Sequence, residues 1–571
     1  MKAGVTMVMA AIIAIVAAAG AAEPAGEPAA VKTVRLELPA DASPVVRHLA
    51  TVCARQVASR CDAKVVTEGD APFVVALATA ADIGAEGYRI EDRSGGGTRI
   101  VGHDDRGLVA GVGKFLRTSR YDRGGFTPGT WRGGSVPAKP HRGIYFATHF
   151  HNWYHAAPVP DVQRYVEDLA LWGTNELLVW YDMHHFKGFD DPEAVAFRAR
   201  LHAVLEAARR MGMDVSLLVI GNEGYANSPA ELRSQGGGRG GYYACDICPG
   251  KPEGMKYILD VIGREFDWAA DLRPRSIWIW PYDQGGCGCA ECRPWGSKGF
   301  MRCVEQIGKL ARAKLPGTKI AISTWFMDKN EWAGVTERLA RDPGLADLVV
   351  IEPGHGPGRG AVDQALPIIG FPEISMHGTW PWGGFGATPL TARAEGQWKA
   401  VRDRWTGGYP YSEGLYEDLT KAAYAQFYWN DRPAAETVKE YAAFEFSPDV
   451  ADEVVEVVKT LERNHHNRWW PGLHDGVPLT ISGLPTKGAK PQADPGAEEA
   501  FATMQRVDAR LTPQARASWR WRLLYLRALL DAKLKANGGV PDDACNDAFA
   551  ELFQIYHADE ALADVRPPRR A

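Results

Sequence analysis

Residues 276–295 read SIWIWPYDQGGCGCAECRPW. A short apolar and aromatic run, from Ile277 to Trp280, leads to Asp283, and a glycine turn with three clustered cysteines follows. A buried parallel strand has this pattern when it carries a carboxylate to the rim of a barrel. The stretch therefore predicts a candidate catalytic acid directly beside a metal or disulfide cluster.

The same kind of apolar strand recurs on both sides of this stretch, and each recurrence is separated from the next by a longer helical pattern. Alternation of this kind is typical of βα units. Eight such units in residues 140–430 predict a (β/α)8 TIM barrel. The expected strands are 142–149, 175–182, 214–224, 276–283, 319–325, 347–354, 373–380 and 407–414.

Two further domains flank the expected barrel. Residues 31–135 mix alternating strands, an amphipathic helix and a hairpin with a Gly-rich turn, which predicts a small α/β sandwich domain. Residues 431–571 consist mostly of helical patterns and predict a helical C-terminal domain. The fold class is therefore α/β, a TIM barrel between these two domains.

The N-terminal residues 1–22 have the pattern of a secretory signal peptide, with one Lys before an apolar run and small residues after it. We expect export to the periplasm or the medium. No later segment is apolar for long enough to cross a bilayer. The net charge is only −5 and the interior lacks Lys/Arg-rich runs, which argues against nucleic acid as a partner. The 19 Trp residues favour a carbohydrate partner, because indole rings stack on sugar faces.

Active sites of TIM barrels lie at the C-terminal ends of the strands, so the residues that end each strand are the candidates. Carboxylates, imidazoles and aromatic rings converge there. As candidate catalytic carboxyls we take Asp283, Glu352 and Glu413. As candidate substrate-binding residues we take His149, Asp182, Glu223, Gln284, Trp325, Trp380, Trp382 and Tyr411.

These residues suit glycoside hydrolysis, which needs one protonated carboxyl and a second carboxylate or a substrate amide. For any single residue the alternative is structural. A strand-end acid often caps the next helix or pairs with Arg, and Trp380 and Trp382 could belong to the core.

The cysteines of the third and fourth strand-end loops form a second cluster. Their spacing is C-x2-C followed by C-x-C-x2-C, at Cys245, Cys248, Cys287, Cys289 and Cys292. Such spacing suits a structural zinc site, whereas export favours disulfides. The sequence leaves these two alternatives open, and no cofactor is expected for catalysis.

The stretches GYRIE…RIVGHDDRGLVAGVGKFLR (87–117) and HRGIYF (141–146), together with Asp283 at the end of the fourth strand, carry a resemblance. The chain resembles glycoside hydrolases of the beta-N-acetylhexosaminidase and alpha-glucuronidase kind. The resemblance implies a small α/β domain before a catalytic barrel, and a glycosidase activity of the hexosaminidase or glucuronidase type.

One departure from the hexosaminidase pattern concerns the acid. In that family the fourth strand ends in an Asp-Glu pair, whose Asp orients the acetamido group and whose Glu is the general acid. Here the pair is Asp283–Gln284, and Gln cannot donate a proton. The acid is then Asp283 itself or has moved to Glu352, Glu413 or Glu223, unless the site binds sugar without cleaving it.

The leading hypothesis is an exported glycosidase that cleaves an oligo- or polysaccharide. The second is a non-catalytic carbohydrate-binding protein on a degenerate barrel. The third is a metal-dependent hydrolase that uses His149, His151 and Asp182.

Overall fold

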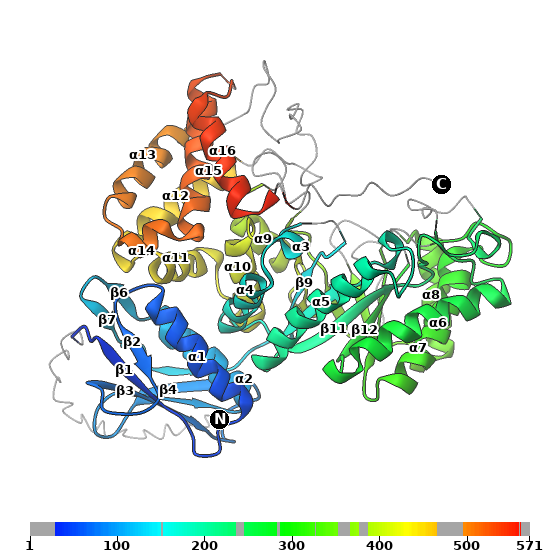
Figure 1. The fold of residues 1–571 in the computed structure, drawn as a ribbon, viewed down its shortest axis with the longest axis horizontal. Helices are drawn as coiled ribbons and strands as arrows, with labels where there is room; N and C mark the ends of the chain where they lie inside the picture. Colours follow the sequence, from blue (N-terminus) through cyan, green and yellow to red (C-terminus); the bar gives the residue numbers. More distant parts are fainter. Residues whose placement is uncertain are drawn as a thin grey trace, which may run out of the picture.

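The computed structural model of the protein describes residues 29–149, 152–235, 245–281, 286–325, 327–351, 366–375, 386–464, 495–538, 540–558 and 560. The expected signal segment, 1–22, lies outside them. Among the described residues, no helix is both long and apolar enough to cross a membrane. Figure 1 shows three parts, which are an N-terminal sheet with two helices, a central barrel, and a C-terminal group of helices beside both.

The N-terminal part is a six-stranded sheet in the order β2-β1-β3-β5-β4-β8. Its strands are β1 (Thr33–Glu37), β2 (Lys64–Val66), β3 (Phe73–Thr79), β4 (Tyr88–Asp92), β5 (Thr98–Gly102) and β8 (Gly133–Ser135). β4 runs antiparallel to its neighbours, and the other pairs are parallel. The helices of this part are α1 (Pro44–Ala58) and α2 (Asp105–Arg117), and β6 (Arg120–Asp122) and β7 (Gly125–Thr127) form a separate hairpin.

The central part is an eight-strand parallel barrel, as the sequence predicts. Its strands are β9 (His141–Phe146), β10 (Glu176–Trp180), β11 (Asp214–Ile220), β12 (Ser276–Trp280), β13 (Lys319–Ser323), β14 (Leu348–Ile351), β15 (Ile368–Gly370), and β16 (Trp405–Gly408) with β17 (Tyr411–Ser412). The ring closes because β9 pairs with β10 on one side and with β16 and β17 on the other. Every residue of β10 and β12 is buried, which explains their unbroken apolar runs.

The eighth position differs from the single strand expected over 407–414. It consists of the two short strands β16 and β17, with Pro410 between them. Proline has no backbone N–H to donate to a ladder. Its carbonyl still accepts from the backbone N–H of Tyr145 at 3.1 Å, so the chain stays against β9.

Helices surround the barrel, and α3 (Trp153–Ala156) is a short extra turn. The others are α4 (Val159–Leu171), α5 (Pro192–Arg210), α6 (Pro252–Ala269), α7 (Met301–Lys314), α8 (Lys329–Arg341), α9 (Thr391–Lys399) and α10 (Asp418–Asn430). The C-terminal helices are α11 (Ala434–Glu445), α12 (Ala451–Arg463), α13 (Ala497–Asp508), α14 (Pro513–Ala517), α15 (Trp519–Ala536) and α16 (Asp543–Ile555).

The N-terminal part is joined to the bottom of the barrel by a buried ion pair. Glu86 contacts the guanidinium of Arg142 on β9 and lies 3.0 Å from Arg106. Burial alone would raise the pKa of Glu86, but the two arginines lower it to about 2. The carboxylate is therefore charged at neutral pH and holds the two parts together.

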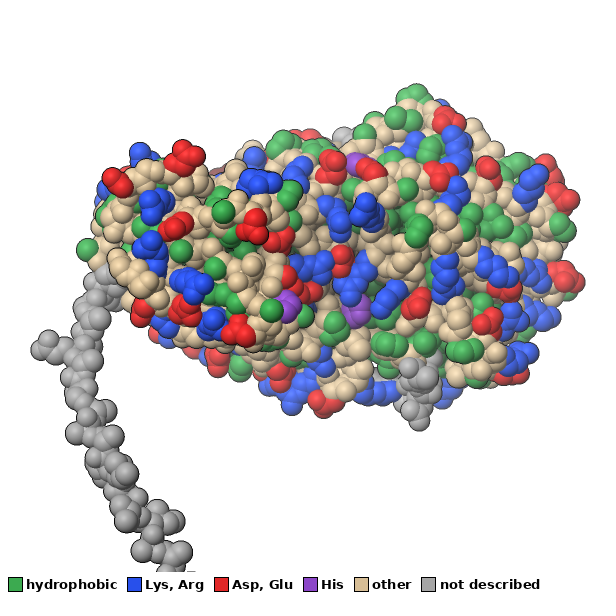
Figure 2. All heavy atoms as spheres, turned by 90° about the horizontal axis from the view of Figure 1, so that it is seen from below, with side chains coloured by type: hydrophobic (Ala, Val, Ile, Leu, Met, Phe, Trp, Pro, Cys, Tyr) green, Lys and Arg blue, Asp and Glu red, His purple; other side chains and the backbone are tan. Residues whose placement is uncertain are grey.

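Acidic and basic side chains intermingle on the face of the molecule that Figure 2 shows. This mixture agrees with the small net charge of −5. It offers no electrostatic reason to expect a polyanion on that face.

Candidate functional site

The strand ends that the sequence singles out meet at one end of the barrel, and the described candidates there are buried. Their exposed fractions are 6% for His149, 1% for Asp182, 1% for Glu223, 9% for Trp325, 7% for Tyr411 and 1% for Glu413. The other candidates, Asp283, Gln284, Glu352, Trp380 and Trp382, lie outside the described residues, as does His151.

Glu223, which follows β11, is a strongly perturbed carboxyl at this rim. Trp180 donates from Nε1 to its Oε2 at 3.1 Å, and the backbone N–H of His184 donates to its Oε1 at 3.2 Å. The His184 ring also contacts Oε1 through Nδ1. Burial, followed by the nearby charge of Asp182, raises the pKa of Glu223 well above its ordinary value. The environment of Glu223 therefore favours the neutral form of its carboxyl over the charged form.

Asp182, after β10, belongs to the same cluster. Its Oδ2 lies 2.5 Å from Nδ1 of His185. Burial alone would lower the pKa of His185, but the Asp182 carboxylate raises it. The ligand atoms of Asp182, His184 and His185 lie close enough together to hold a metal ion. The ion pair and the His184–Glu223 contact already engage these groups, and His149 is not part of the group, so we interpret it as a polar network.

The opposite side of the rim is built around Glu413, which follows β17. Tyr411 donates from its hydroxyl to Oε1 of Glu413 at 2.8 Å. The ring of Tyr411 lies 6.0 Å from that of His149, whose Nδ1 is 3.0 Å from the Tyr145 hydroxyl. His149 in turn lies 4.8 Å, between ring centroids, from Trp180, the residue that donates to Glu223.

A continuous arc of side chains thus runs around the rim from one carboxyl to the other. We call it the rim arc, and it consists of Glu223, His184, Trp180, His149, Tyr411 and Glu413. Trp180 and His184 are absent from the site residues chosen from the sequence. Trp180 is missed because it ends a strand that looks purely apolar. His184, which stands beside His185 just after the second strand, is not chosen because loop imidazoles carry little signal by themselves.

Beneath the arc, aromatic rings from five strand positions pack against one another. Trp280 lies 6.0 Å from Trp325 and 5.1 Å from Phe371, and Phe371 lies 5.2 Å from Tyr145 and 6.1 Å from Tyr411. Such rings offer apolar faces of the kind that pyranose rings stack on. Trp325 is therefore placed in an aromatic floor.

The turn that carries Glu413 is held by Glu417. Oε1 of Glu417 accepts hydrogen bonds from the Ser412 hydroxyl at 2.7 Å and from the backbone N–H groups of Glu413 and Gly414 at 2.9 and 3.1 Å. The carbonyl of Glu413 accepts from the Tyr556 hydroxyl, beyond the end of α16. The C-terminal helices therefore help to fix the position of a rim residue.

The cysteines of the β11 and β12 loops also come together. The sulfurs of Cys248, Cys287, Cys289 and Cys292 all lie within 4.8 Å of one another, and this group could hold a metal such as zinc. Cys245, which the spacing groups with them, does not belong to this set. All nine cysteines are free, so the disulfide alternative is not formed in this structure.

Asn222, the residue before Glu223, connects the two cysteine loops. Its Nδ2 donates to the carbonyls of Ile247 and Gly286 at 2.8 and 3.1 Å, and its Oδ1 accepts from the backbone N–H of Gly286 at 2.9 Å. These bonds use the side chain fully, so Asn222 positions loops at the rim.

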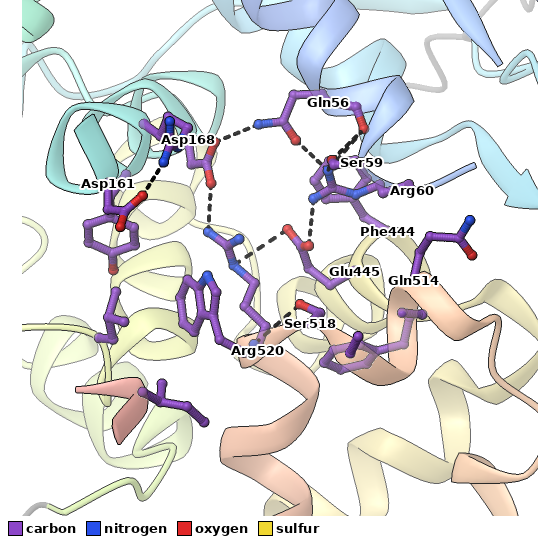
Figure 3. Close-up of a pocket in the computed structure, with 18 of the residues that line it drawn as sticks. Gln56, Ser59, Arg60, Asp161, Asp168, Phe444, Glu445, Gln514, Ser518 and Arg520 are labelled. Carbon is purple, nitrogen blue, oxygen red and sulfur yellow. Dashed lines mark hydrogen bonds and ion pairs between the residues drawn. The ribbon is translucent and has the colours of Figure 1, made fainter. Parts of the chain in front are cut away.

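A cavity of about 630 Å³ lies away from the rim, where the three parts of the chain meet. We call it the junction pocket, lined by Arg55, Arg60, Asp168, Glu445 and Arg520 among others. Arg520 donates to Asp168 at 3.0 Å and lies 3.7 Å from Glu445, which also pairs with Arg60 at 2.6 Å, as Figure 3 shows. Arg55 lies 3.0 Å from Asp168. Because its charges are mutually neutralised, this pocket joins domains and offers little free charge to a ligand.

The barrel, its N-terminal sheet and its C-terminal helices together define a glycoside hydrolase-like fold. The chain is similar to the family GH115 4-O-methyl-alpha-glucuronidase BtGH115A, with a TM-score of 0.59 at 10% identity, over 93% of this chain and 76% of that one. It is similar to the GH20 beta-N-acetylhexosaminidase from Streptomyces coelicolor A3(2), with a TM-score of 0.51 at 15% identity, over 76% of this chain and 94% of that one.

A third similar structure is CpGH89 from Clostridium perfringens, with a TM-score of 0.62 at 12% identity. The match covers 90% of this chain and 63% of that one. No family model and no curated protein matches the chain. The resemblance to hexosaminidases and alpha-glucuronidases is thereby confirmed for the fold, and at these identities it extends no further.

Proposed function

We propose that this protein is an exported glycoside hydrolase that cleaves glycosidic bonds in an oligo- or polysaccharide. The general acid in this proposal is Glu223. The second carboxyl is Asp283, Glu352 or Glu413, each of which follows another strand of the barrel in the sequence. The proposed sugar unit is an N-acetylhexosamine or a uronic acid, because the similar structures include hexosaminidases and a glucuronidase.

One observation carries the proposal, namely a buried carboxyl with a raised pKa at the C-terminal rim of a glycosidase-like barrel. Glu223 is buried, donors from Trp180 and His184 hold its oxygens, and its pKa is raised well above the ordinary value. A glycosidase needs such a carboxyl to protonate the leaving oxygen. Carboxyls whose surroundings raise the pKa at a cleft are candidates for this role.

The position of Glu223 also fits the Gln at position 284, after β12. Gln284 replaces the general acid of hexosaminidases, and Gln has no proton to give. Glu223 follows β11, which pairs directly with β12 in the sheet. We infer that the acid has moved by one strand around the rim.

The experiment is a screen of purified protein against aryl glycosides and natural oligosaccharides, with Glu223→Gln and Asp283→Asn run beside it. The matched control is Glu265→Gln, because Glu265 is also fully buried and its pKa is also raised, but it lies on helix α6. We expect cleavage by the wild type and the control, and loss in Glu223→Gln. Unchanged turnover in Glu223→Gln would refute its role as the acid.

The second candidate function is carbohydrate binding without cleavage, and Gln284 is the observation that favours it. This function predicts saturable binding to glycans and no new reducing ends over time. A glycan array combined with a reducing-end assay separates it from the first proposal. Turnover that survives exhaustive chelation would remove a metal-dependent hydrolase.

Export is part of the proposal and rests on the signal-like residues 1–22. Fractionation of the producing cells and sequencing of the mature N-terminus test it. A mature chain in the periplasm or the medium, starting after the small residues near position 22, is the expected result. An uncleaved chain in the cytoplasm would contradict export.

A further inference from the structure

Four thiols from two separate loops share one centre. Cys248 comes from the loop between β11 and α6, whereas Cys287, Cys289 and Cys292 come from the loop between β12 and α7. The Sγ of Cys248 lies 3.5 Å from that of Cys287, 3.7 Å from that of Cys289 and 3.9 Å from that of Cys292. Three of the four are buried, and Cys289 is partly exposed.

These separations match one tetrahedral metal and do not match disulfides. Four sulfurs at about 2.3 Å from a zinc ion in a tetrahedron lie about 3.8 Å from one another. Sulfurs in a disulfide are about 2.05 Å apart. Cys248 has the three other sulfurs at nearly equal distances, whereas a disulfide would single out one partner.

We propose that Cys248, Cys287, Cys289 and Cys292 bind one structural Zn²⁺ ion. Four thiolates close the coordination sphere and leave no position for water or substrate, so the metal has no part in the chemistry. The inference does not depend on the proposed hydrolase activity.

Backbone hydrogen bonds fix the two loops around the cysteine cluster. The backbone N–H of Cys248 donates to Leu232 O at 2.8 Å, and that of Gly288 donates to Gln235 O at 2.9 Å. The N–H groups of Cys292 and Arg293 both donate to Cys289 O at 3.1 Å, which forms a tight turn between two of the ligands. The loops are therefore set by backbone bonds in the conformation that brings the sulfurs together.

A glycine leaves room beside the cluster. A Cβ on Gly250 would lie 2.9 Å from the Cβ of Glu291 and 3.1 Å from the Sγ of Cys292. A side chain there would push the two loops apart. The small residue beside Cys248 is therefore required by the close approach of the loops.

The expected structural role of the zinc ion follows from the residues that the two cysteine loops contact. Asn222 hydrogen-bonds to both loops and directly precedes Glu223. A metal that ties the loops together also fixes the frame around Glu223. Zinc in such sites contributes directly to the free energy of folding.

The test is metal analysis of the full-length purified protein, prepared without chelator and without added metal. We expect about one zinc per chain and four thiols that react with a thiol reagent only after the metal is removed. Co²⁺ in place of zinc should give the visible absorption of a tetrahedral thiolate site. Iron in place of zinc, or no metal, would overturn the proposal.

The chain supplies a matched control in Cys245, which is buried on the same loop but outside the cluster. Cys245→Ser should keep the zinc and the cobalt spectrum, whereas Cys248→Ser and Cys289→Ser should lose both. If Cys248→Ser fails to fold, Cys289→Ser at the partly exposed position and the wild-type stoichiometry still decide the matter. Intact-mass analysis that finds two disulfides among these cysteines in folded protein would overturn the inference.

Discussion

Buried carboxyls occur in two parts of this protein, the junction pocket and the rim arc, and their surroundings differ. Asp168 in the junction pocket lies within 3.0 Å of Arg55 and of Arg520. Glu223 in the rim arc has uncharged donors and a second carboxylate, Asp182, nearby. Burial raises the pKa in both places, but the arginines lower that of Asp168, whereas Asp182 raises that of Glu223 further.

The difference separates structural carboxylates from chemically useful ones. A carboxylate that is neutralised by Arg stays ionised and joins elements together. A carboxyl that is buried beside a like charge keeps its proton and can donate it. A cavity of about 630 Å³ lies at the junction pocket, yet the proposed chemistry belongs to the rim.

The largest expected effect comes from removing Arg520, the centre of the junction pocket. Arg520→Met removes one cationic partner from the buried carboxylates of Asp168, Asp418 and Glu445. Removing one partner of a buried ion pair costs about 3–5 kcal/mol of unfolding free energy. Chemical denaturation of both proteins measures the loss.

Arg522→Met, on the same helix, is the control. Arg522 pairs with Glu551 at 2.5 Å, but the Glu551 side chain is 38% exposed. Surface pairs contribute about 0–1 kcal/mol. Equal losses for the two variants would contradict the structural role assigned to the junction pocket.

The next largest expected effect comes from substituting Glu223 in the rim arc. Glu223→Gln keeps the shape of the side chain and removes its proton, so kcat/KM should fall about 10²- to 10⁴-fold. The loss should shrink for aryl glycosides with acidic leaving groups, because those groups need little protonation. An equal loss for good and poor leaving groups would argue against Glu223 as the general acid.

Much of the fold could be predicted from the sequence, because buried parallel strands are unbroken apolar runs. SIWIW (276–280) and ELLVW (176–180) are of this kind, and both are barrel strands. The residues that follow such runs lie at the rim of any parallel barrel. His149, Glu223 and Glu413 could be placed there for that reason alone.

The ion-pair partners, pKa shifts and cluster membership of the site residues could not be predicted, because they depend on contacts between distant residues. Arg520 and Asp168 are 352 positions apart, and no local pattern connects them. The raised pKa of Glu223 depends on Asp182, which another strand supplies. Cys245 and Cys248 look equivalent in a C-x2-C motif, but only Cys248 joins the cluster.

The split of the eighth strand follows from Pro410, which is visible in the sequence. Its effect on the hydrogen-bond ladder, however, depends on the neighbouring strand β9.

A smaller expected effect is the pH dependence of stability. It differs between buried carboxyls whose pKa is raised and those whose pKa is lowered by arginine. Glu265 is buried with no hydrogen-bond partner for either oxygen in the described part of the chain, and burial, followed by the neighbouring Glu223 carboxyl, raises its pKa. The native state then holds this proton more tightly than the unfolded state does. Stability is therefore highest below about pH 4.3 and falls as the pH rises toward the folded pKa, by up to about 1.4 kcal/mol per pH unit for one group.

Glu265→Gln should flatten this decline between pH 5 and 8, as thermal unfolding at each pH would show. Asp168→Asn provides the contrast, because a lowered pKa gives stability that is present above the unfolded pKa and is lost as the pH falls. Its effect should appear at the acid end only. A decline with rising pH that Glu265→Gln leaves unaltered would mean that this carboxyl is not buried in its neutral form.

The smallest effect decides whether Glu413 belongs with the rim carboxyls or with the structural ones. Tyr411→Phe removes the hydroxyl that donates to Glu413 at 2.8 Å, at a cost of about 1 kcal/mol of stability. Tyr416→Phe is the matched control, because its buried hydroxyl donates to the backbone carbonyl of Leu552 at 2.9 Å. Both variants should lose similar stability in denaturant titrations. If Glu413 contacts the substrate, only Tyr411→Phe should also lower kcat/KM, because the Tyr411 hydroxyl no longer helps to position the carboxylate. Equal activity in the two variants would place Glu413 with the carboxylates that only stabilise the fold, and would leave Asp283 and Glu352 as partners for Glu223.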